Sequence, residues 1–419
     1  MGKKKKIKIL LITEYFPPEI GAGSNRAYEH AFIWRNEGAE VTILTGFPDY
    51  PDGIVPEEYK GYHFLKEVIN GLNIVRTYTY SAPNEGFFKR SISYLSFMFS
   101  SVIQGTRKIG KQDIIIATSP PFFVGVAGFL ISRFKHVPFV FEVRDLWPDS
   151  IVELGQLRNS LIIKLLQMLE KFLYKKAKLI VVVANSSIEL IRKKGVSSKK
   201  IFVIKNGVDL NKFKLIENEY TLKIKEELQI SNKFIVTYIG TLGLSHAIDK
   251  VLETANLLIE SKDIVFLIIG SGAEKTNLIR KKTELNLKNV IFLNQMPKDK
   301  IPLYYSISDV LLVPLKKLDL FSNVIPSKIF EIMAMSKPII ISVDGEARKI
   351  VEEAGAGLFA KPVDPSDLKE KIILLKNDPD LCLKFGKNGR LFVQNFFDRE
   401  NLAINYLQLL ESAVKESLK

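Results

Sequence analysis

The 419-residue sequence is poor in cysteine, in histidine and in long apolar runs. Its one cysteine, Cys382, excludes an internal disulfide framework and is typical of a reducing compartment. The four histidines are scattered, and no cysteine–histidine cluster has the spacing of a metal site. Apolar runs such as 120–131 fall short of the ~20 residues that span a bilayer. The lysine-rich start lacks the apolar segment of a signal peptide. We therefore expect a cytoplasmic protein that can touch a membrane without crossing it.

Positive charge, in contrast, is abundant, with a formal net charge of +14. Between Arg158 and Lys214 there are fourteen Lys and Arg residues against three acidic ones, Glu170, Glu189 and Asp209. Such a basic surface can meet nucleic acid, an anionic membrane or an anionic ligand. No helix-turn-helix, zinc-finger or RNP pattern accompanies it, so we expect no nucleic acid partner.

The length and the apolar pattern predict two domains. Apolar runs of strand length alternate with helical patterns, which is typical of parallel sheets covered on both faces. In the first half we expect strands at 8–13, 41–45, 74–78, 113–117, 139–143, 179–183 and 201–204. In the second half we expect strands at 234–239, 264–269, 290–293, 310–314, 338–342 and 357–359.

The predicted fold class is therefore α/β, with two Rossmann-like, doubly wound domains at 1–205 and 206–397. A last helix at 398–419 is expected to pack back toward the N-terminal domain. Ligands of open α/β sheets bind outside the carboxyl ends of the strands, so we expect the site in a cleft between facing domains.

The stretch 325–342 reads as a loop, a short helix and a buried strand. Pro326 fits the first position of that helix, where its missing N–H costs nothing. A helix start with Lys328 suits a phosphate. Glu331, one turn later, can accept hydrogen bonds from the vicinal hydroxyls of a ribose. The stretch predicts a grip on a nucleoside diphosphate, and the alternative is an ordinary αβ unit with a surface lysine and glutamate.

Glycines recur where predicted strands end. Gly21 and Gly23 follow the first strand, and Gly240, Gly270 and Gly345 follow three strands of the second half. Glycine lets a backbone approach a ligand closely. The spacing is not G-x-G-x-x-G, so the generic dinucleotide fingerprint is absent. Many αβ loops carry glycines, but their recurrence predicts a phosphate-binding rim.

Charged residues also follow the predicted strand at 139–143. Arg144, Asp145 and Trp147 come at its carboxyl end, and Ser119 follows the predicted strand at 113–117. Packing alone explains such a charged segment poorly, so a functional role is favoured.

These motifs together resemble glycosyltransferase family 4, whose members have the GT-B fold. The resemblance covers nearly the whole chain and rests on 17–23, 206–209, 270–272, 330–334 and 363–365. The segments 143–148 and 325–328 are similar to bacterial O-antigen and capsule enzymes that add amino sugars to polyprenyl-diphosphate-linked acceptors.

The resemblance implies a retaining transfer from a nucleotide diphosphate sugar, usually a UDP-sugar, with no metal and no other cofactor. Protein donors then neutralise the leaving diphosphate. Glu331 matches the second Glu of the family's E-x7-E motif, which binds the nucleotide ribose. We assign donor binding to Gly21, Gly23, Gly240, Thr241, His246, Gly270, Asn323, Ser327, Lys328 and Glu331. We assign catalytic roles to Arg144, Asp145 and Lys328, and acceptor binding to Ser119 and Trp147.

Three positions depart from the family pattern. Asn323 stands where the first Glu of E-x7-E belongs. Thr241 and His246 stand where many relatives have an Arg and a Lys on the diphosphate. Lys328 is therefore expected to supply the main positive charge for the leaving group, and Arg144 the second. The leaving phosphate is thought to help take the acceptor proton in such enzymes, so we assign no dedicated base.

A membrane surface is the second expected partner. The segment 86–103 reads as an apolar helix flanked by Lys89, Arg90, Arg107 and Lys108, and the region 158–194 is basic. Together they predict a docking face for an anionic leaflet on the N-terminal domain, at the inner face of the cytoplasmic membrane. The alternative is a core helix beside an incidentally basic surface.

The main hypothesis is thus a glycosyltransferase of surface polysaccharide biosynthesis. It would move an N-acetylated amino or deoxyamino sugar from a UDP-sugar to a lipid-diphosphate-linked saccharide. A UDP-sugar 2-epimerase on the same fold is disfavoured by the scattered histidines. A non-enzymatic basic protein that binds membrane or nucleic acid leaves Glu331 and Arg144 unexplained.

Overall fold

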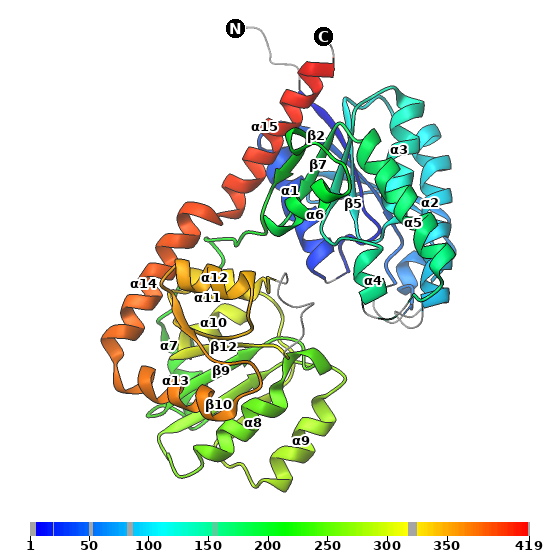
Figure 1. The fold of residues 1–419 in the computed structure, drawn as a ribbon. Helices are drawn as coiled ribbons and strands as arrows, with labels where there is room; N and C mark the ends of the chain where they lie inside the picture. The colour runs from blue at the N-terminus through cyan, green and yellow to red at the C-terminus, as the bar shows by residue number, and fades with distance from the viewer. Residues whose placement is uncertain are drawn as a thin grey trace, which may run out of the picture. The chain divides into compact units, whose positions relative to one another are not determined.

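The computed structural model describes residues 6–19, 21–49, 53–81, 87–153, 155, 157–316 and 325–417. The chain divides between Asn206 and Gly207 into two compact units, drawn in Figure 1. Unit 1 contains the chain up to Asn206 and again from Glu400 onward, and unit 2 runs from Gly207 to Arg399. Each unit has a sheet of its own, with helices on both faces.

The sheet of unit 1 has the strand order β3-β4-β2-β1-β5-β6-β7-β8. Neighbouring strands are parallel except for the antiparallel pair of β3 and β4. The strands are β1 (Lys8–Ile12), β2 (Glu40–Gly46), β3 (Phe64–Ile69), β4 (Leu72–Thr77), β5 (Ile114–Ser119), β6 (Phe139–Val143), β7 (Leu179–Val182) and β8 (Ile201–Val203).

Strand β3 was not predicted. It forms the edge of the sheet, and its side chains alternate between partly buried and exposed. The turn to β4 passes through Asn70 and Gly71, which both have positive φ, at 51° and 76°. An edge hairpin with one wet face lacks the continuous apolar run that identifies the central strands.

The two faces of this sheet carry separate clusters of buried side chains. On one face Ile9 and Leu11 pack with α1 and α15, and on the other Leu10 and Ile12 pack with α2, α3 and α5 (Figure 1). The helices are α1 (Ala22–Asn36), α2 (Phe87–Lys108), α3 (Phe123–Lys135), α4 (Asp149–Glu153), α5 (Ser160–Lys176), α6 (Ser186–Lys193) and α15 (Arg399–Ser417), with short 3-10 turns at Glu57–Tyr59 and Ser198–Lys200. The indole nitrogen of Trp34 donates to the carbonyl of Ala403 at 2.9 Å and ties α15 to α1.

The sheet of unit 2 is parallel throughout, in the order β11-β10-β9-β12-β13-β14. Its strands are β9 (Phe234–Ile239), β10 (Ile264–Ile269), β11 (Val290–Leu293), β12 (Val310–Pro314), β13 (Ile339–Ser342) and β14 (Gly357–Phe359). Its helices are α7 (Glu219–Glu227), α8 (Ile248–Leu257), α9 (Lys275–Glu284), α10 (Ile301–Ile307), α11 (Lys328–Ala334), α12 (Glu346–Glu353), α13 (Pro365–Asn377) and α14 (Pro379–Phe396), with a 3-10 turn at Leu244–His246.

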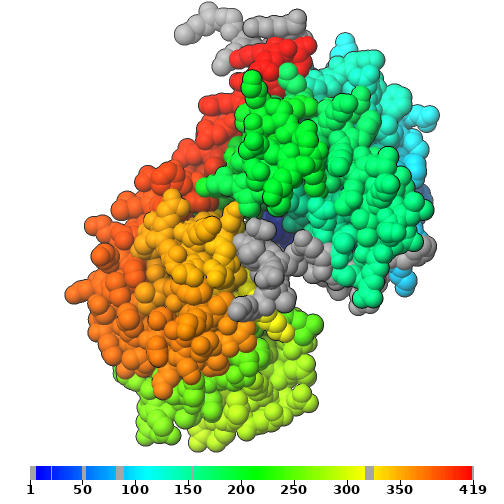
Figure 2. Space-filling view, in the orientation of Figure 1, coloured from blue at the N-terminus to red at the C-terminus, as the bar shows by residue number. Residues whose placement is uncertain are grey.

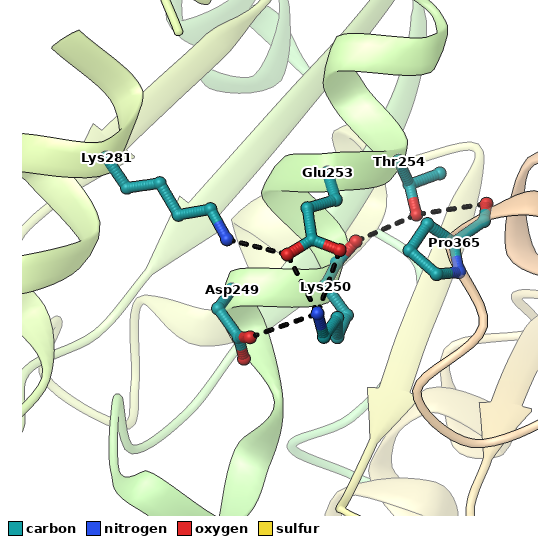
Figure 3. Close-up of polar contacts among 6 residues, drawn as sticks. All are labelled: Asp249, Lys250, Glu253, Thr254, Lys281 and Pro365. Carbon is teal, nitrogen blue, oxygen red and sulfur yellow. Dashed lines mark hydrogen bonds and ion pairs between the residues drawn. The ribbon is translucent and has the colours of Figure 1, made fainter. Parts of the chain in front are cut away.

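Polar contacts link three of these helices, α8, α9 and α13. The carboxylate of Glu253 on α8 accepts from Lys250 at 2.8 Å and from Lys281 on α9 at 2.7 Å (Figure 3). The hydroxyl of the next residue, Thr254, lies 3.3 Å from the carbonyl oxygen of Pro365 at the start of α13. This network is structural, because it links α8, α9 and α13.

In both sheets the strand order reverses beside the first strand of the unit. In unit 1 the reversal lies between β1 and β5, and in unit 2 between β9 and β12. Ligands of open α/β sheets bind at such switch points, outside the carboxyl ends of the strands. Gly23, in the first turn of α1, follows β1, and Gly240 follows β9, so both stand at a switch point.

Candidate functional site

The short helix that carries Lys328 and Glu331 begins later than expected. The structure places the N-cap at Ser327 and the first helical residue at Lys328, so the prediction that Pro326 takes the first helical position is wrong. The carbonyl of Pro326 accepts from the amide of Ile329 at 3.1 Å, because a tight turn leads into the helix. Lys328 therefore stands at the first position of a seven-residue helix.

The ammonium of Lys328 lies against the end of β9 and the loop that follows it. It lies 4.1 Å from the centre of the Tyr238 ring. A Cβ at Gly240 would overlap with it, so the glycine leaves room for the lysine. Among the described residues Lys328 forms no ion pair, and burial lowers its pKa to about 8 despite the opposing effect of Glu331. The result is a desolvated cation that is held by a ring face.

His246 lies beside this cation. Its ring centre is 6.4 Å from that of Tyr238, and its Nδ1 lies 3.3 Å from the hydroxyl of Ser245. Burial and the charge of Lys328 lower the pKa of His246, with an opposing effect from a hydrogen bond to Gly243. The imidazole is therefore neutral at physiological pH and adds a hydrogen-bonding group, not a second cation, beside Lys328.

Glu331 lies one turn along α11 and is partly buried. The hydroxyl of Tyr305 donates to its Oε2 at 3.3 Å. Burial raises the pKa of Glu331, while the charges of Lys298 and Arg399 lower it. A carboxylate in this environment keeps acceptor capacity for hydroxyl groups of a ligand.

Glycines in the loops after β9 and β10 allow these two loops to pack closely against each other. The amide of Gly240 donates to Ile269 at 2.9 Å, and that of Leu242 donates to Ser271 at 2.8 Å. A Cβ at Gly270 would overlap with the carbonyl of Gly240. Gly270 is therefore needed for the packing of the loops after β9 and β10, whether or not a phosphate approaches it.

Most of the residues of the second half that were predicted to bind the donor lie together in unit 2. Thr241 and Ser327 are exposed beside the enclosed Lys328. Asn323 lies outside the described residues. Neither Tyr238 nor Tyr305 was predicted from the sequence. The one sequence feature that points to Tyr238 is its position two residues before Gly240.

In unit 1 the corresponding cation is Arg144. Its amide donates to the carbonyl of Ser119 at 3.0 Å, and its guanidinium donates to Pro120 at 3.0 Å. Burial lowers the pKa of Arg144, against an opposing effect of Glu142. Its buried Nε has no hydrogen-bond partner among the described residues. Arg144 thus has donor capacity that the described part of the protein leaves unused.

Gly23 makes room for this guanidinium. Helix α1 begins at Ala22, so Gly23 lies in its first turn. A Cβ on Gly23 would lie 2.7 Å and 2.8 Å from the two terminal nitrogens of Arg144, whereas one on Gly21 would meet nothing within 4 Å. The two glycines of this loop therefore have different roles.

The remaining predictions after β5 and β6 differ in accessibility. Asp145 is exposed, although the surrounding protein still raises its pKa by desolvation. Trp147 stacks on Phe122 with 4.7 Å between the ring centres. Ser119 is buried, with 1% of its surface exposed. Its carbonyl contributes to the site by positioning Arg144.

Part of the charged segment around β6 is structural. Glu142 is buried and forms an ion pair of 2.6 Å with Arg26 of α1. Arg26 also donates to the carbonyls of Ile204 and Lys205 and to the side chain of Asn206, where unit 1 first ends. This network secures the end of β8, and the sequence analysis did not foresee it.

Within the part of the chain that the structure describes, no three His, Cys, Asp or Glu side chains gather closely enough to hold a metal ion. The segment Asp378-Pro379-Asp380 has D-x-D spacing, but Asp378 caps α14 by accepting from Leu381 at 2.9 Å. No helix in the described ranges is both long enough and apolar enough to cross a bilayer.

Two family models match the chain. The model described as Glycosyltransferase Family 4 matches residues 23–212, and the one described as Glycosyl transferases group 1 matches residues 221–392. Together they cover both units.

Relatives of known name match over much of their length. The putative colanic acid biosynthesis glycosyl transferase of Escherichia coli K12 is 22% identical over 408 residues, covering 96% of this chain and 99% of that protein. The N,N'-diacetylbacillosaminyl-diphospho-undecaprenol alpha-1,3-N-acetylgalactosaminyltransferase of Campylobacter jejuni is 26% identical over 291 residues, covering 69% of this chain and 74% of that protein. The structure of Anabaena HepE in complex with UDP and glucose has a TM-score of 0.72 at 18% identity, covering 97% of this chain and 100% of that one.

Proposed function

Because the chain belongs to family 4 of the glycosyltransferases and has their two-domain GT-B fold, we propose that it transfers a sugar, with retention, from a UDP-sugar to a lipid-diphosphate-linked saccharide. The product would belong to surface polysaccharide biosynthesis, the process in which its relatives act. The observation that carries the proposal is the desolvated ammonium of Lys328, held over Tyr238 beside Gly240.

Unit 2 would bind the donor. Lys328 would neutralise the charge that develops on the leaving diphosphate, and an unpaired cation in a desolvated site is effective in this role. Glu331 would accept hydrogen bonds from the ribose hydroxyls. Ser327, Gly240 and Thr241 would border the diphosphate, and His246 would contribute a neutral hydrogen-bonding group.

Unit 1 would supply a second cation and the acceptor side. Arg144 would donate from its unused Nε to the donor phosphate or the acceptor, with Gly23 leaving space for its guanidinium. Asp145 would lie beside it, and Trp147 would offer an apolar wall to the acceptor. The hydroxyl of the acceptor would attack the anomeric carbon, the bond to the leaving diphosphate would break, and the diphosphate oxygen would take the proton. No separate base is required.

The nature of donor and acceptor is inferred from the relatives. The Campylobacter jejuni relative acts, by its name, on a diphospho-undecaprenol saccharide and transfers an N-acetylated amino sugar. HepE shares the fold and was crystallised with UDP and glucose. These likenesses favour a UDP-linked amino sugar and a polyprenyl-diphosphate acceptor for this chain.

A lipid-linked acceptor requires access to a membrane surface, and α5 provides a suitable face. The inner side of this helix packs on unit 1 through Leu166 and Leu173, yet its outer side is also apolar. Leu161, Leu165 and Met168 are 76%, 64% and 61% exposed and share one side of the helix. Figure 2 shows the green-to-teal helices of unit 1 at the molecular surface.

The charges around this stripe suit an anionic leaflet. Lys164, Lys171 and Lys175 are exposed on the same helix. On α2, which packs on the same face of the sheet, Phe99 and Ile103 are also exposed. An apolar stripe beside lysines fits a helix that lies in the membrane interface. We propose peripheral attachment to the inner face of the cytoplasmic membrane through α5 and α2.

The test is release of UDP from a panel of UDP-sugars, with and without a short-chain lipid-diphosphate saccharide. We expect acceptor-dependent UDP release and a product with retained anomeric configuration. A UDP-sugar 2-epimerase would convert the sugar and keep the diphosphate bond at turnover. Failure to release UDP with every donor in the presence of acceptor would reject the proposal.

A further inference from the structure

One buried carboxyl group of unit 1 has no role in the site described above. Glu14 follows β1 by two residues, at the switch point of the sheet, and is 4% exposed. Its backbone carbonyl accepts from the hydroxyl of Thr45 at 3.0 Å and from the amide of Gly46 at 3.2 Å. Its side-chain Oε2 is buried and has no hydrogen-bond partner among the described residues. The backbone of Glu14 is thus fixed, while the Oε2 of its carboxyl group is unsatisfied.

Charged and phenolic groups from three elements face this carboxyl. Asp49 follows β2, Glu19 and Tyr15 lie in the loop after β1, and Arg90 comes from α2. Glu19 is engaged in the loop, because its carboxylate accepts from the amides of Phe16 and Asp49, each at 3.1 Å.

Arg90 does not neutralise Glu14 by direct pairing. Its guanidinium donates to the hydroxyl of Tyr94 on its own helix, at 2.9 Å and 3.0 Å. Burial raises the pKa of Glu14 well above its usual value, Asp49 and Glu19 raise it further, and Arg90 opposes them. The carboxyl group of Glu14 therefore takes up a proton more readily than an exposed glutamate, and its Oε2 keeps unused hydrogen-bonding capacity.

Neither packing nor a metal explains this residue. A buried polar atom without a partner destabilises the folded state, so a purely structural Glu14 would be unfavourable. The carboxylates around it do not form a metal-binding group within the described ranges. The neighbouring Asp49 and Glu19 repel anions, so a phosphate is not a suitable ligand either. An uncharged group that can both donate and accept a hydrogen bond is the chemistry that fits.

We propose that Glu14 recognises the acceptor saccharide, by a hydrogen bond between its carboxyl group and a sugar hydroxyl or acetamido group. This inference rests on the proposed function and adds a specificity residue to the acceptor side of unit 1. A hydroxyl can both donate and accept a hydrogen bond, and the N–H of an acetamido group can donate to a carboxyl oxygen. Either contact gives the unsatisfied Oε2 a partner. The acceptor diphosphate would bind elsewhere, away from Asp49 and Glu19.

The test compares Glu14→Leu, Glu14→Gln and the control Thr45→Val. For Glu14→Leu we expect the acceptor KM to rise roughly ten-fold, with donor KM and acceptor-independent donor hydrolysis unchanged. Glu14→Gln keeps a donor and an acceptor, so its acceptor KM should stay within about three-fold of the wild-type value. Thr45→Val removes the hydrogen bond to the Glu14 carbonyl, and should lower Tm without changing the acceptor KM.

A wild-type acceptor KM in folded Glu14→Leu would overturn the inference, and so would a loss of donor hydrolysis equal to the loss of transfer. If Glu14→Leu does not fold, Glu14→Asp provides the same reading, because its shorter side chain withdraws the carboxyl group. Calorimetry with a short-chain lipid-diphosphate saccharide measures the effect of the Glu14 substitution on acceptor binding, without turnover. Acceptor binding that is weakened by Glu14→Leu, in a protein that releases no UDP, would reject the proposed function alone.

Discussion

The ammonium of Lys328 lies 4.1 Å from the centre of the Tyr238 ring and forms no ion pair among the described residues. The negative face of an aromatic ring attracts a cation without neutralising it. A carboxylate at the same place would hold the lysine and compete with an incoming phosphate. The contact with Tyr238 therefore fixes the position of the charge and leaves it available to the diphosphate of a donor.

The first prediction concerns the separate roles of Lys328 and Glu331. We expect Lys328→Ala to lower kcat about 100-fold, because the charge acts on the leaving diphosphate in the transition state. We expect Glu331→Ala to raise the donor KM by a similar factor, because the ribose is bound equally in ground and transition states. Steady-state kinetics with varied donor at saturating acceptor separates the two effects.

The matched control is Lys376→Ala, which removes a lysine of unit 2 that pairs with Asp263 at the surface. It should leave both constants unchanged. Near-normal turnover of Lys328→Ala would show that the charge for the leaving group comes from another residue.

The second prediction is a dependence of donor capture on pH. Lys328 has a pKa of about 8 in the free protein, so its charge is lost as the pH rises through that value. We expect kcat/KM for the donor to fall above pH 8, since this constant reports ionisations of the free enzyme. In Lys328→Arg the guanidinium stays charged, so the alkaline limb of the residual activity should disappear. An unchanged alkaline limb in Lys328→Arg would assign it to another group.

The third prediction is that Lys328 costs stability. In the unfolded chain the lysine keeps its proton up to about pH 10.5, but in the folded protein only up to about pH 8. At neutral pH the buried charge thus destabilises the protein by on the order of 2–3 kcal/mol, and this cost declines as the pH rises from 8 to 10.5. We expect Lys328→Met to raise Tm at pH 7 and to lose activity.

The stability difference between wild type and Lys328→Met should shrink toward pH 10. Melting curves at several pH values measure it directly. A Met variant that is less stable than wild type at pH 7 would contradict the account of Lys328 as a desolvated charge.

The fold was predictable because the central strands have a simple signature. All six residues of β10 are buried, and a continuous apolar run of this kind is typical of an inner strand of a parallel sheet. The edge strand β3 escaped prediction because its side chains alternate between partly buried and exposed ones. The resemblance to family 4, which rests on loops at strand ends, was confirmed by the family models.

The site was only partly predictable, for reasons that particular residues illustrate. Gly270 looked like a phosphate-binding glycine, but its proximity to the Gly240 carbonyl is visible only in the folded loops. The contact of Lys328 with Tyr238 joins residues that are far apart in the sequence. The unsatisfied Oε2 of Glu14 depends on its burial in the folded unit. A sequence pattern shows which residues end a strand. It does not show which side chains lie opposite those residues in the folded protein.

The fourth prediction separates two glycines of one loop. In Gly23→Ala the new methyl group would collide with the guanidinium of Arg144, at 2.7–2.8 Å from its terminal nitrogens. Arg144 would have to move, and we expect a fall in kcat of about ten-fold or more. Gly21→Ala meets open space, and its extended φ of −177° suits any residue. It should lose less activity. Equal losses in both variants would indicate that ligand approach, not the position of Arg144, controls the effect.

The fifth prediction concerns the outer face of α5. Replacing Leu161, Leu165 and Met168 by serine should abolish binding to vesicles that contain anionic lipid, measured by flotation. The reason is that these exposed side chains supply the apolar area that would enter the interface, while each nearby lysine adds only about 1 kcal/mol. Tm and acceptor-independent donor hydrolysis should remain unchanged, because the three side chains are on the outer side of the helix.

A matched control for the α5 variant is available in unit 2. Leu383 and Leu391 on α14 are 72% and 50% exposed, so their replacement by serine removes similar apolar area from a helix outside unit 1. This control should float with vesicles like the wild type. Wild-type binding should weaken with salt, because the lysines of α5 act through screened charge. Salt-insensitive flotation, or equal loss in both variants, would exclude α5 as the docking face and leave the apolar stripe to a protein partner.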